Sequence, residues 1–182
     1  MKILNIKKFS GKYFSLKDMK QQNRRRTLYL CQAAAIASLY VLLTLLSQML
    51  GMGSGVIQIR FSEMLCLLPV LLPAAVPGVT VGCFLANLLT GAVWLDVLVG
   101  PIATLIGAVG TYLLRKNRWV AALPPVLSNA LIVPFVLAYG YGAEEAIPLM
   151  MLTVGIGEIL SIYVLGMLLF RASEPFLKRM KQ

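Results

Sequence analysis

The chain has 182 residues, of which 59% are hydrophobic, and carries a formal net charge of +10. This hydrophobic content lies far outside the range of soluble domains and indicates an integral membrane protein. A spanning helix needs roughly 20 apolar residues, so the nearly continuous apolar region 28–170 has room for about six spans. We expect neither a separate soluble domain nor a nucleotide-binding domain, since the motif GxxxxGKS/T is absent from the sequence.

Basic residues gather in three clusters beside apolar segments. Of the seventeen Lys and Arg residues, nine lie before Thr27, three lie in 115–118 and four lie after Phe170. Basic residues that flank spans mark the cytoplasmic side of a membrane, so we interpret the charge as a topology signal rather than a nucleic-acid site. Residues 1–26 are predicted to be a basic cytoplasmic leader, either an interfacial segment on anionic membrane lipid or a flexible tail.

Six apolar segments follow one another along the chain. We predict spans over about 28–50, 61–76, 79–89, 94–114, 120–139 and 147–170, the second of them broken by Pro69 and Pro73. The alternation in 56–60 predicts a short extended loop between the first two spans, and Pro77-Gly78 predicts a tight turn before the third.

This order of spans agrees with the charge pattern. If the amino terminus is inside, six crossings place all three basic clusters on the same side of the membrane. We therefore predict an all-α membrane protein, a compact bundle of six transmembrane helices with both termini cytoplasmic. Residues 27–171 would form the membrane domain, and residues 172–182 a cytoplasmic tail.

Three carboxylates, Glu63, Asp96 and Glu158, lie within or beside the apolar segments. An ionisable group in lipid is costly, so it usually faces a cavity, a partner or a ligand. We predict a pocket that opens to the outside and binds a small polar ligand, with carboxylates and amides forming hydrogen bonds and aromatic rings stacking. Further candidate lining residues come from the outer loops and helix ends: Gln58, Arg60, Asn87, Trp94, Tyr139, Tyr141, Glu144 and Glu145. Asn129 lies deeper, midway along the fifth span.

Each candidate also has a structural interpretation, and the sequence leaves both open. Arg60 can pair with Glu63 at the surface, and Trp94 can anchor the interface as part of an aromatic belt. Asn87 and Asn129 can hydrogen-bond between helices, and Asp96 can cap the fourth helix. The mid-span position of Glu158 makes it the hardest to explain without a function.

Other residue types narrow the possible chemistry. Ala33 and Ala37 form a small-xxx-small pair in the first span, which lets another helix approach closely. The three cysteines lie in apolar segments without paired spacing, and the chain has no histidine, so we expect no disulfide, metal site or cofactor. No paired nucleophile and base is evident, so we predict no catalytic residue and no enzyme activity.

Four strings, in order, resemble the QueT family of queuosine-precursor transporters. They are IQIRFSEML at 57–65, VPGVTVGCFLAN at 76–87, LPPVLSNA at 123–130 and GIGE at 155–158. The resemblance covers roughly 28–170 and leaves the basic leader outside. It identifies the chain as similar to an S component of an energy-coupling-factor (ECF) transporter, a class of six short spans without its own ATPase.

The resemblance implies substrate capture at the prokaryotic cell membrane. The ligand would be a 7-deazaguanine such as preQ1, preQ0 or queuine, and the partners a membrane coupling (T) component and two cytoplasmic ATPases. Ala33 and Ala37 would then contact the coupling protein. Two alternatives stay open: an S component for another vitamin (riboflavin, thiamine, folate or biotin), and a proton-coupled secondary transporter with Glu158 as the carrier.

Overall fold

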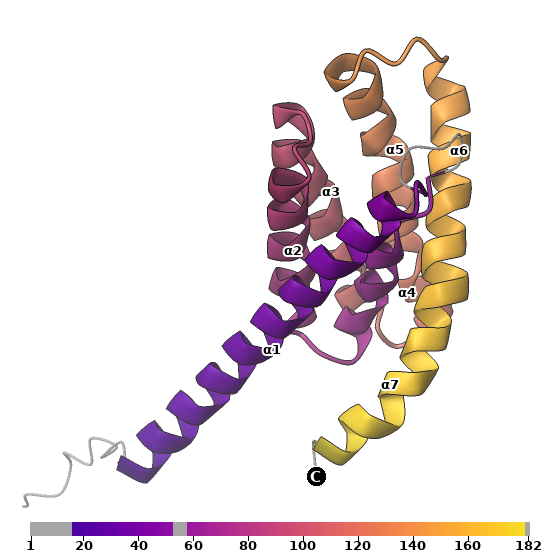
Figure 1. Ribbon diagram of the computed structural model, residues 1–182. Coiled ribbons are helices and arrows are strands. Elements are labelled where there is room, and N and C mark those ends of the chain that lie inside the picture. The colour runs from indigo at the N-terminus through magenta and orange to yellow at the C-terminus, as the bar shows by residue number, and fades with distance from the viewer. Residues whose placement is uncertain (1–15, 53–57, 181–182) are drawn as a thin grey trace, which may run out of the picture.

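A computed structural model describes residues 16–52 and 58–180, and every regular element in these ranges is helical. Figure 1 shows the helices gathered into one bundle, from which the beginning of α1 projects. The elements in chain order are α1 (Leu16–Met49), η1 (Phe61–Val70), α2 (Ala75–Leu89), α3 (Trp94–Leu113), α4 (Arg118–Ala121), α5 (Leu123–Gly140), α6 (Ile147–Ile159), η2 (Leu160–Gly166) and α7 (Met167–Met180).

The six predicted spans correspond to six helical segments. Four are long and apolar enough to cross a membrane: Met19–Met49, Trp94–Leu113, Arg118–Gly140 and Ile147–Pro175. The last two of these are composite, since α4 leads into α5, and α6 continues through the π-helical turn η2 into α7. The predicted domain limits at 26/27 and 171/172 therefore fall inside α1 and α7.

The second and third segments are shorter than the other four. η1 is a ten-residue 3₁₀ helix, about 20 Å long at roughly 2 Å per residue, and α2 has fifteen residues. The predicted second span to residue 76 was too long, because the helix ends at Val70 beside Pro69. The predicted tight turn at Pro77-Gly78 was wrong, since both residues lie in the first turn of α2, where proline has no hydrogen bond to lose.

η1 lies at the centre of the bundle. It packs against α1, α2, α3, α4, η2 and α7. Seven of its ten residues are buried, among them Glu63, Leu65 and Cys66. A helix surrounded on all sides has no solvent-facing stripe, so its side chains, including the carboxylate, must find partners within the protein.

Small residues bring α1 and α2 together. A Cβ atom on Gly78 would lie 2.9 Å from the carbonyl oxygen of Ala33, and one on Gly82 would lie 3.1 Å from Cα of Ala37 and 2.7 Å from Cβ of Tyr40. The Ala33/Ala37 pair thus packs on a Gly-xxx-Gly pair of α2, inside this bundle. The predicted close helix approach is present, but its partner is α2.

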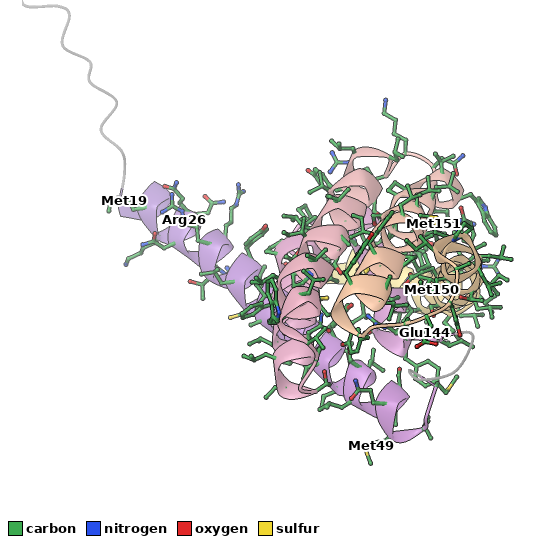
Figure 2. The ribbon with its side chains drawn as sticks, turned by 90° about the horizontal axis from the view of Figure 1, so that it is seen from above. Met19, Arg26, Met49, Glu144, Met150 and Met151 are labelled. Atoms are coloured by element: carbon green, nitrogen blue, oxygen red, sulfur yellow. The ribbon has the colours of Figure 1, made fainter. Side chains whose placement is uncertain are left out.

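The outer faces of the helices are strongly apolar. Leu42, Leu98, Ile102, Leu131 and Leu152 are all more than half exposed. Apolar surface this extensive is unusual for a protein surrounded by water and suits contact with lipid. The beginning of α1 and the end of α7 lie at one end of the bundle, opposite the α5–α6 loop (Figure 1). Seen from above, Met19 and Arg26 project clear of the bundle (Figure 2).

Candidate binding site

A cavity of about 380 Å³ opens at the end of the bundle opposite the termini. It is formed by the ends of α1, α2, α3 and α5 and by the segments that join them. Glycines Gly51 and Gly91, with φ of 70° and 69°, end α1 and α2 there in the left-handed conformation that favours glycine. The lining residues are Thr44, Ser47, Gln48, Gln58, Arg60, Asn87, Thr90, Gly91, Ala92, Asp96, Leu137 and Tyr141.

One wall of the cavity is a polar stripe on α1. Thr44, Ser47 and Gln48 line it, and Ser47 and Gln48 follow Thr44 by three and four residues, so the three side chains share one face of the helix. The hydroxyl of Ser47 accepts a 2.8 Å hydrogen bond from the backbone N–H of Phe61. This bond fixes the start of η1 against α1 and so places Arg60 at the cavity.

Asp96 is held in place at the start of α3. Its Oδ2 accepts a 3.1 Å hydrogen bond from the hydroxyl of Tyr141, and its Oδ1 accepts a 3.4 Å bond from Nδ2 of Asn87. The same Asn87 nitrogen donates to the backbone carbonyl of Asp96 at 2.9 Å. Val93, rather than Asp96, is the N-cap of α3, so the capping alternative does not account for this carboxylate.

Tyr141 strengthens this arrangement. Partial burial, with the neighbouring Asp96 carboxylate, raises the pKa of the Tyr141 hydroxyl above its ordinary value. The hydroxyl therefore stays protonated, and donates to Asp96, over the whole physiological range.

Arg60 lines the same cavity and is half-buried. It forms no ion pair within 4.0 Å in the part of the chain that the structure describes, so the predicted surface pair with Glu63 is not formed. Burial opposes the positive charge, but the carboxylates of Asp96 and then Glu63 outweigh it, and the pKa of Arg60 lies above its ordinary value. Arg60 is therefore a cation at the cavity that has no ion-pair partner among the described residues.

The other two carboxylates belong to a separate, buried network. Oε1 of Glu63 accepts a 2.5 Å hydrogen bond from the hydroxyl of Tyr40, and Oε2 accepts from Cys66 at 3.2 Å. Nδ2 of Asn129 donates to both Glu63, at 3.3 Å, and Oε1 of Glu158, at 3.0 Å. None of these five residues lines the cavity. Asn129 thus bonds between helices, as its structural alternative predicted.

Glu158 keeps one unsatisfied atom. Its Oε2 is buried and has no hydrogen-bond partner among the described residues. The neighbouring Gly157 is in tight contact with the backbone of Gln58, since a Cβ atom there would lie 3.0 Å from the carbonyl carbon of Gln58. An unpaired buried carboxyl oxygen costs free energy, so this position is a place where a proton or a water molecule would stabilise the protein.

The predicted site residues therefore separate into three groups. Arg60, Asn87 and Asp96 meet at the cavity, whereas Glu63, Asn129 and Glu158 meet in the buried network. Trp94 and Tyr139 lie in neither group, because their side chains are 72% and 77% exposed. Sequence reasoning missed the α1 wall, although the spacing of Thr44, Ser47 and Gln48 within an apolar span was a signal that could have revealed it.

Comparison with known proteins gives the family. Residues 30–175 match the model of the QueT transporter family. The chain belongs to the QueT transporter family. Within this family, a protein called the queuosine precursor transporter QueT, from Lactococcus lactis subsp. cremoris (strain MG1363), is 35% identical over 83 residues. These residues are 46% of this chain and 48% of the relative, so the match spans about half the length of that relative. No solved structure matches the chain.

Membership of the QueT transporter family fits the apolar helices. A transporter family and four helices able to span a membrane together indicate a multi-pass membrane protein. The family match covers every residue that lines the cavity or belongs to the buried network, and it runs from within α1 to within α7.

Proposed function

We propose that this protein is the substrate-binding S component of an ECF-type importer in a prokaryotic cell membrane. It would capture a queuosine precursor, a 7-deazaguanine such as preQ1, preQ0 or queuine, from outside and deliver it to the cytoplasm. Two features support the proposal: the family match, and a polar cavity at the bundle end that lies away from the basic termini. Asp96, held by Asn87 and Tyr141 within this cavity, is the single observation on which we rest ligand capture.

The chemistry of the cavity suits such a ligand. A deazaguanine presents a ring N–H and an exocyclic amine side by side, and one carboxylate can accept both. An ionised carboxylate offers about four acceptor positions, of which Tyr141 and Asn87 use two at Asp96. A volume of about 380 Å³ falls in the range of pockets that enclose small molecules.

Coupling to an ATP-driven module would need an exposed helix face. Because Ala37 is buried against Gly82, we move the proposed contact one position around α1, to Ala34 and Ser38, which are exposed four residues apart. Small residues on a lipid-facing surface allow a second helix to approach closely. The partners would be a membrane coupling component and two cytoplasmic ATPases.

Binding and uptake test the two halves of the proposal separately. Detergent-purified protein is titrated with preQ1, preQ0, queuine, guanine and riboflavin by isothermal calorimetry. We expect one deazaguanine to bind at least 100-fold more tightly than riboflavin, and no binding of any deazaguanine would overturn the ligand assignment. In vesicles that also contain a coupling component and ATPases, uptake should require ATP.

A second candidate is favoured by one observation: Oε2 of Glu158 has no hydrogen-bond partner among the described residues. A mid-span carboxyl group with a free oxygen is what a proton-coupled transporter would use. This candidate predicts uptake by the protein alone, in ATP-free vesicles, driven by a pH gradient and abolished in Glu158→Gln. Uptake that occurs only with ATP and the coupling proteins would exclude it.

A further inference from the structure

The hydrogen-bonding groups of the cavity divide into those already paired and those left uncommitted. Thr44 and Ser47 donate to backbone carbonyls of α1 at 2.9 Å, and Asn87 and Tyr141 donate to Asp96. Within the described part of the chain, the side chains of Gln48, Gln58 and Arg60 make no hydrogen bond. Among the described residues, one charged donor at the cavity, Arg60, has no side-chain hydrogen bond, and Asp96 keeps further acceptor positions.

Two different elements bring these opposite charges to the cavity, since Arg60 precedes η1 and Asp96 lies in α3. Arg60 and Asp96 line the same space, yet no ion pair within 4.0 Å joins them in the described residues. Opposite charges in a partly buried site attract strongly, and the charge of Asp96 is the largest influence that raises the pKa of Arg60. Asn87 and Tyr141 hold the carboxylate of Asp96 by hydrogen bonds. The carboxylate also lies close to the backbone of α3, since a Cβ atom at Gly100 would be only 2.8 Å from Oδ1.

A guanine-type ring has the complementary pattern on one edge. Its 6-carbonyl oxygen is an acceptor, and the adjacent N1–H and 2-amino group are donors. Arginine donating to the carbonyl oxygen of guanine, and carboxylates accepting from ring amino groups, are common pairings in nucleic-acid recognition. In a 7-deaza base a carbon atom replaces N7. The 6-carbonyl oxygen is then the remaining acceptor on the edge that carries N7 and O6 in guanine.

We propose that Arg60 and Asp96 are a specificity pair that binds this edge from both sides. Arg60 donates to the 6-carbonyl oxygen, and Asp96 accepts from N1–H and the 2-amino group. This inference rests on the proposed function, because it assumes a deazaguanine ligand. It adds a discriminating role for Arg60 and assigns the ring edge to Asp96 rather than to Glu63 or Glu158.

The pair explains how the site would reject a 6-amino purine. An amino group at position 6 would place donors against the donors of Arg60, and an unprotonated N1 would place an acceptor against Asp96. Two buried groups would then be left unpaired, and such mismatches discriminate far more strongly than a missing apolar contact.

The test compares two ligands that differ only at this edge. The first ligand is the 7-deazaguanine that binds the wild type, and the second is its 2,6-diamino counterpart with the same substituent at position 7. Each is titrated into wild type, Arg60→Lys, Arg60→Met and Arg115→Met. We expect the wild type to prefer the 6-oxo ligand by on the order of 100-fold or more. Arg60→Met should reduce this preference at least tenfold, and Arg60→Lys, which keeps the charge but not the planar fork, should fall between.

Arg115→Met is the matched control, because Arg115 is exposed beyond the end of α3 and contacts the ring of Tyr112. It should keep the wild-type preference. Thermal unfolding checks that each variant is folded, and competition titration extends the range if Arg60→Met binds weakly. If both ligands weaken equally in the Arg60 variants, so that the preference is unchanged, the specificity role is refuted while the proposed function stands. If the wild type binds no deazaguanine, the proposed function itself fails and this inference fails with it.

Discussion

A single methyl group at Gly100 should disturb ligand binding without entering the cavity. Gly100 is buried in α3, one turn after Asp96, and does not line the cavity. A Cβ atom there would lie 2.7 Å from Nδ2 of Asn87 and 2.8 Å from Oδ1 of Asp96. Ordinary contact distances are about 3.5 Å or more, so the Gly100→Ala variant must displace one or both side chains by roughly 0.7 Å.

The size of the effect follows from this displacement. Overpacking a tight site costs about 1–3 kcal/mol, and misplacing the Asp96 carboxylate should weaken ligand binding by roughly 10- to 100-fold, which corresponds to about 1.4–2.8 kcal/mol. Gly155→Ala is the matched control, since its Cβ would lie 3.6 Å from Cβ of Ala130, an ordinary contact. Both changes gain the same helix propensity of about 1 kcal/mol, so that gain cancels in the comparison.

Calorimetric titration and thermal unfolding of the two variants provide the measurement. We expect Gly155→Ala to bind as the wild type does and Gly100→Ala to lose both affinity and stability relative to it. Equal affinities and equal melting temperatures for the two variants would refute the view that the position of Asp96 controls binding.

Three further predictions concern other parts of the site. Asp96→Asn should weaken deazaguanine binding at least 100-fold and Glu158→Gln less than tenfold, because, of these two carboxylates, only Asp96 lines the cavity. A titration in which Glu158→Gln weakened binding more than Asp96→Asn would show that the ligand binds at the buried network. Since burial and Asp96 raise the pKa of Tyr141, its neutral form stabilises the folded state fully below pH 10 and that stabilisation is lost as the pH rises further. Melting curves from pH 8 to 11 should therefore show the wild type losing its advantage over Tyr141→Phe above about pH 10, and a constant difference would contradict this. Ala34→Trp should bind the ligand as the wild type does but lose ATP-dependent uptake. Ala37→Trp should fail to fold, because Ala37 is buried against Gly82 and a larger side chain has no space there. Normal uptake by Ala34→Trp would show that the coupling protein contacts another surface.

The helical architecture was largely predictable because it depends on apolar length. Spans of about 20 hydrophobic residues and the three basic clusters predict six crossings without any knowledge of packing. The exception lies where proline acts locally. The predicted break of the second segment by proline is present, since η1 ends at Val70. Pro77, however, lies in the first turn of α2 instead of in a turn before it, because the two positions of proline look alike in sequence.

The site was harder to predict because helix rotation decides which residues face inward. Trp94 and Asp96 are two residues apart, so they point to nearly opposite sides of α3, and only Asp96 is buried. At the end of α5 both Tyr139 and Tyr141 were candidates, and only Tyr141 lines the cavity. A single sequence gives polarity but not the rotation of each helix.

The depth of the carboxylates could not be predicted for a related reason. Glu158 was expected at the ligand because it lies mid-span, but Asn129 and Glu63 provide it with neighbours inside the protein. Asn129 pairs with Glu63, which is 66 positions away in the sequence, and with Glu158, which is 29 positions away. Such pairing depends on tertiary packing, which the periodicity of a sequence does not report. The packing of the Ala33/Ala37 pair on α2 also depends on tertiary structure, and its contact with a coupling protein stays a prediction.

The most direct test is an experimental structure of the protein with a bound 7-deazaguanine. We predict that the ring lies in the cavity, with Asp96 contacting N1–H and the 2-amino group, Arg60 contacting the 6-carbonyl oxygen and Glu158 making no contact. A ligand bound instead against Asn129 and Glu158, with Asp96 and Arg60 still unoccupied, would contradict the assignment of the cavity as the binding site.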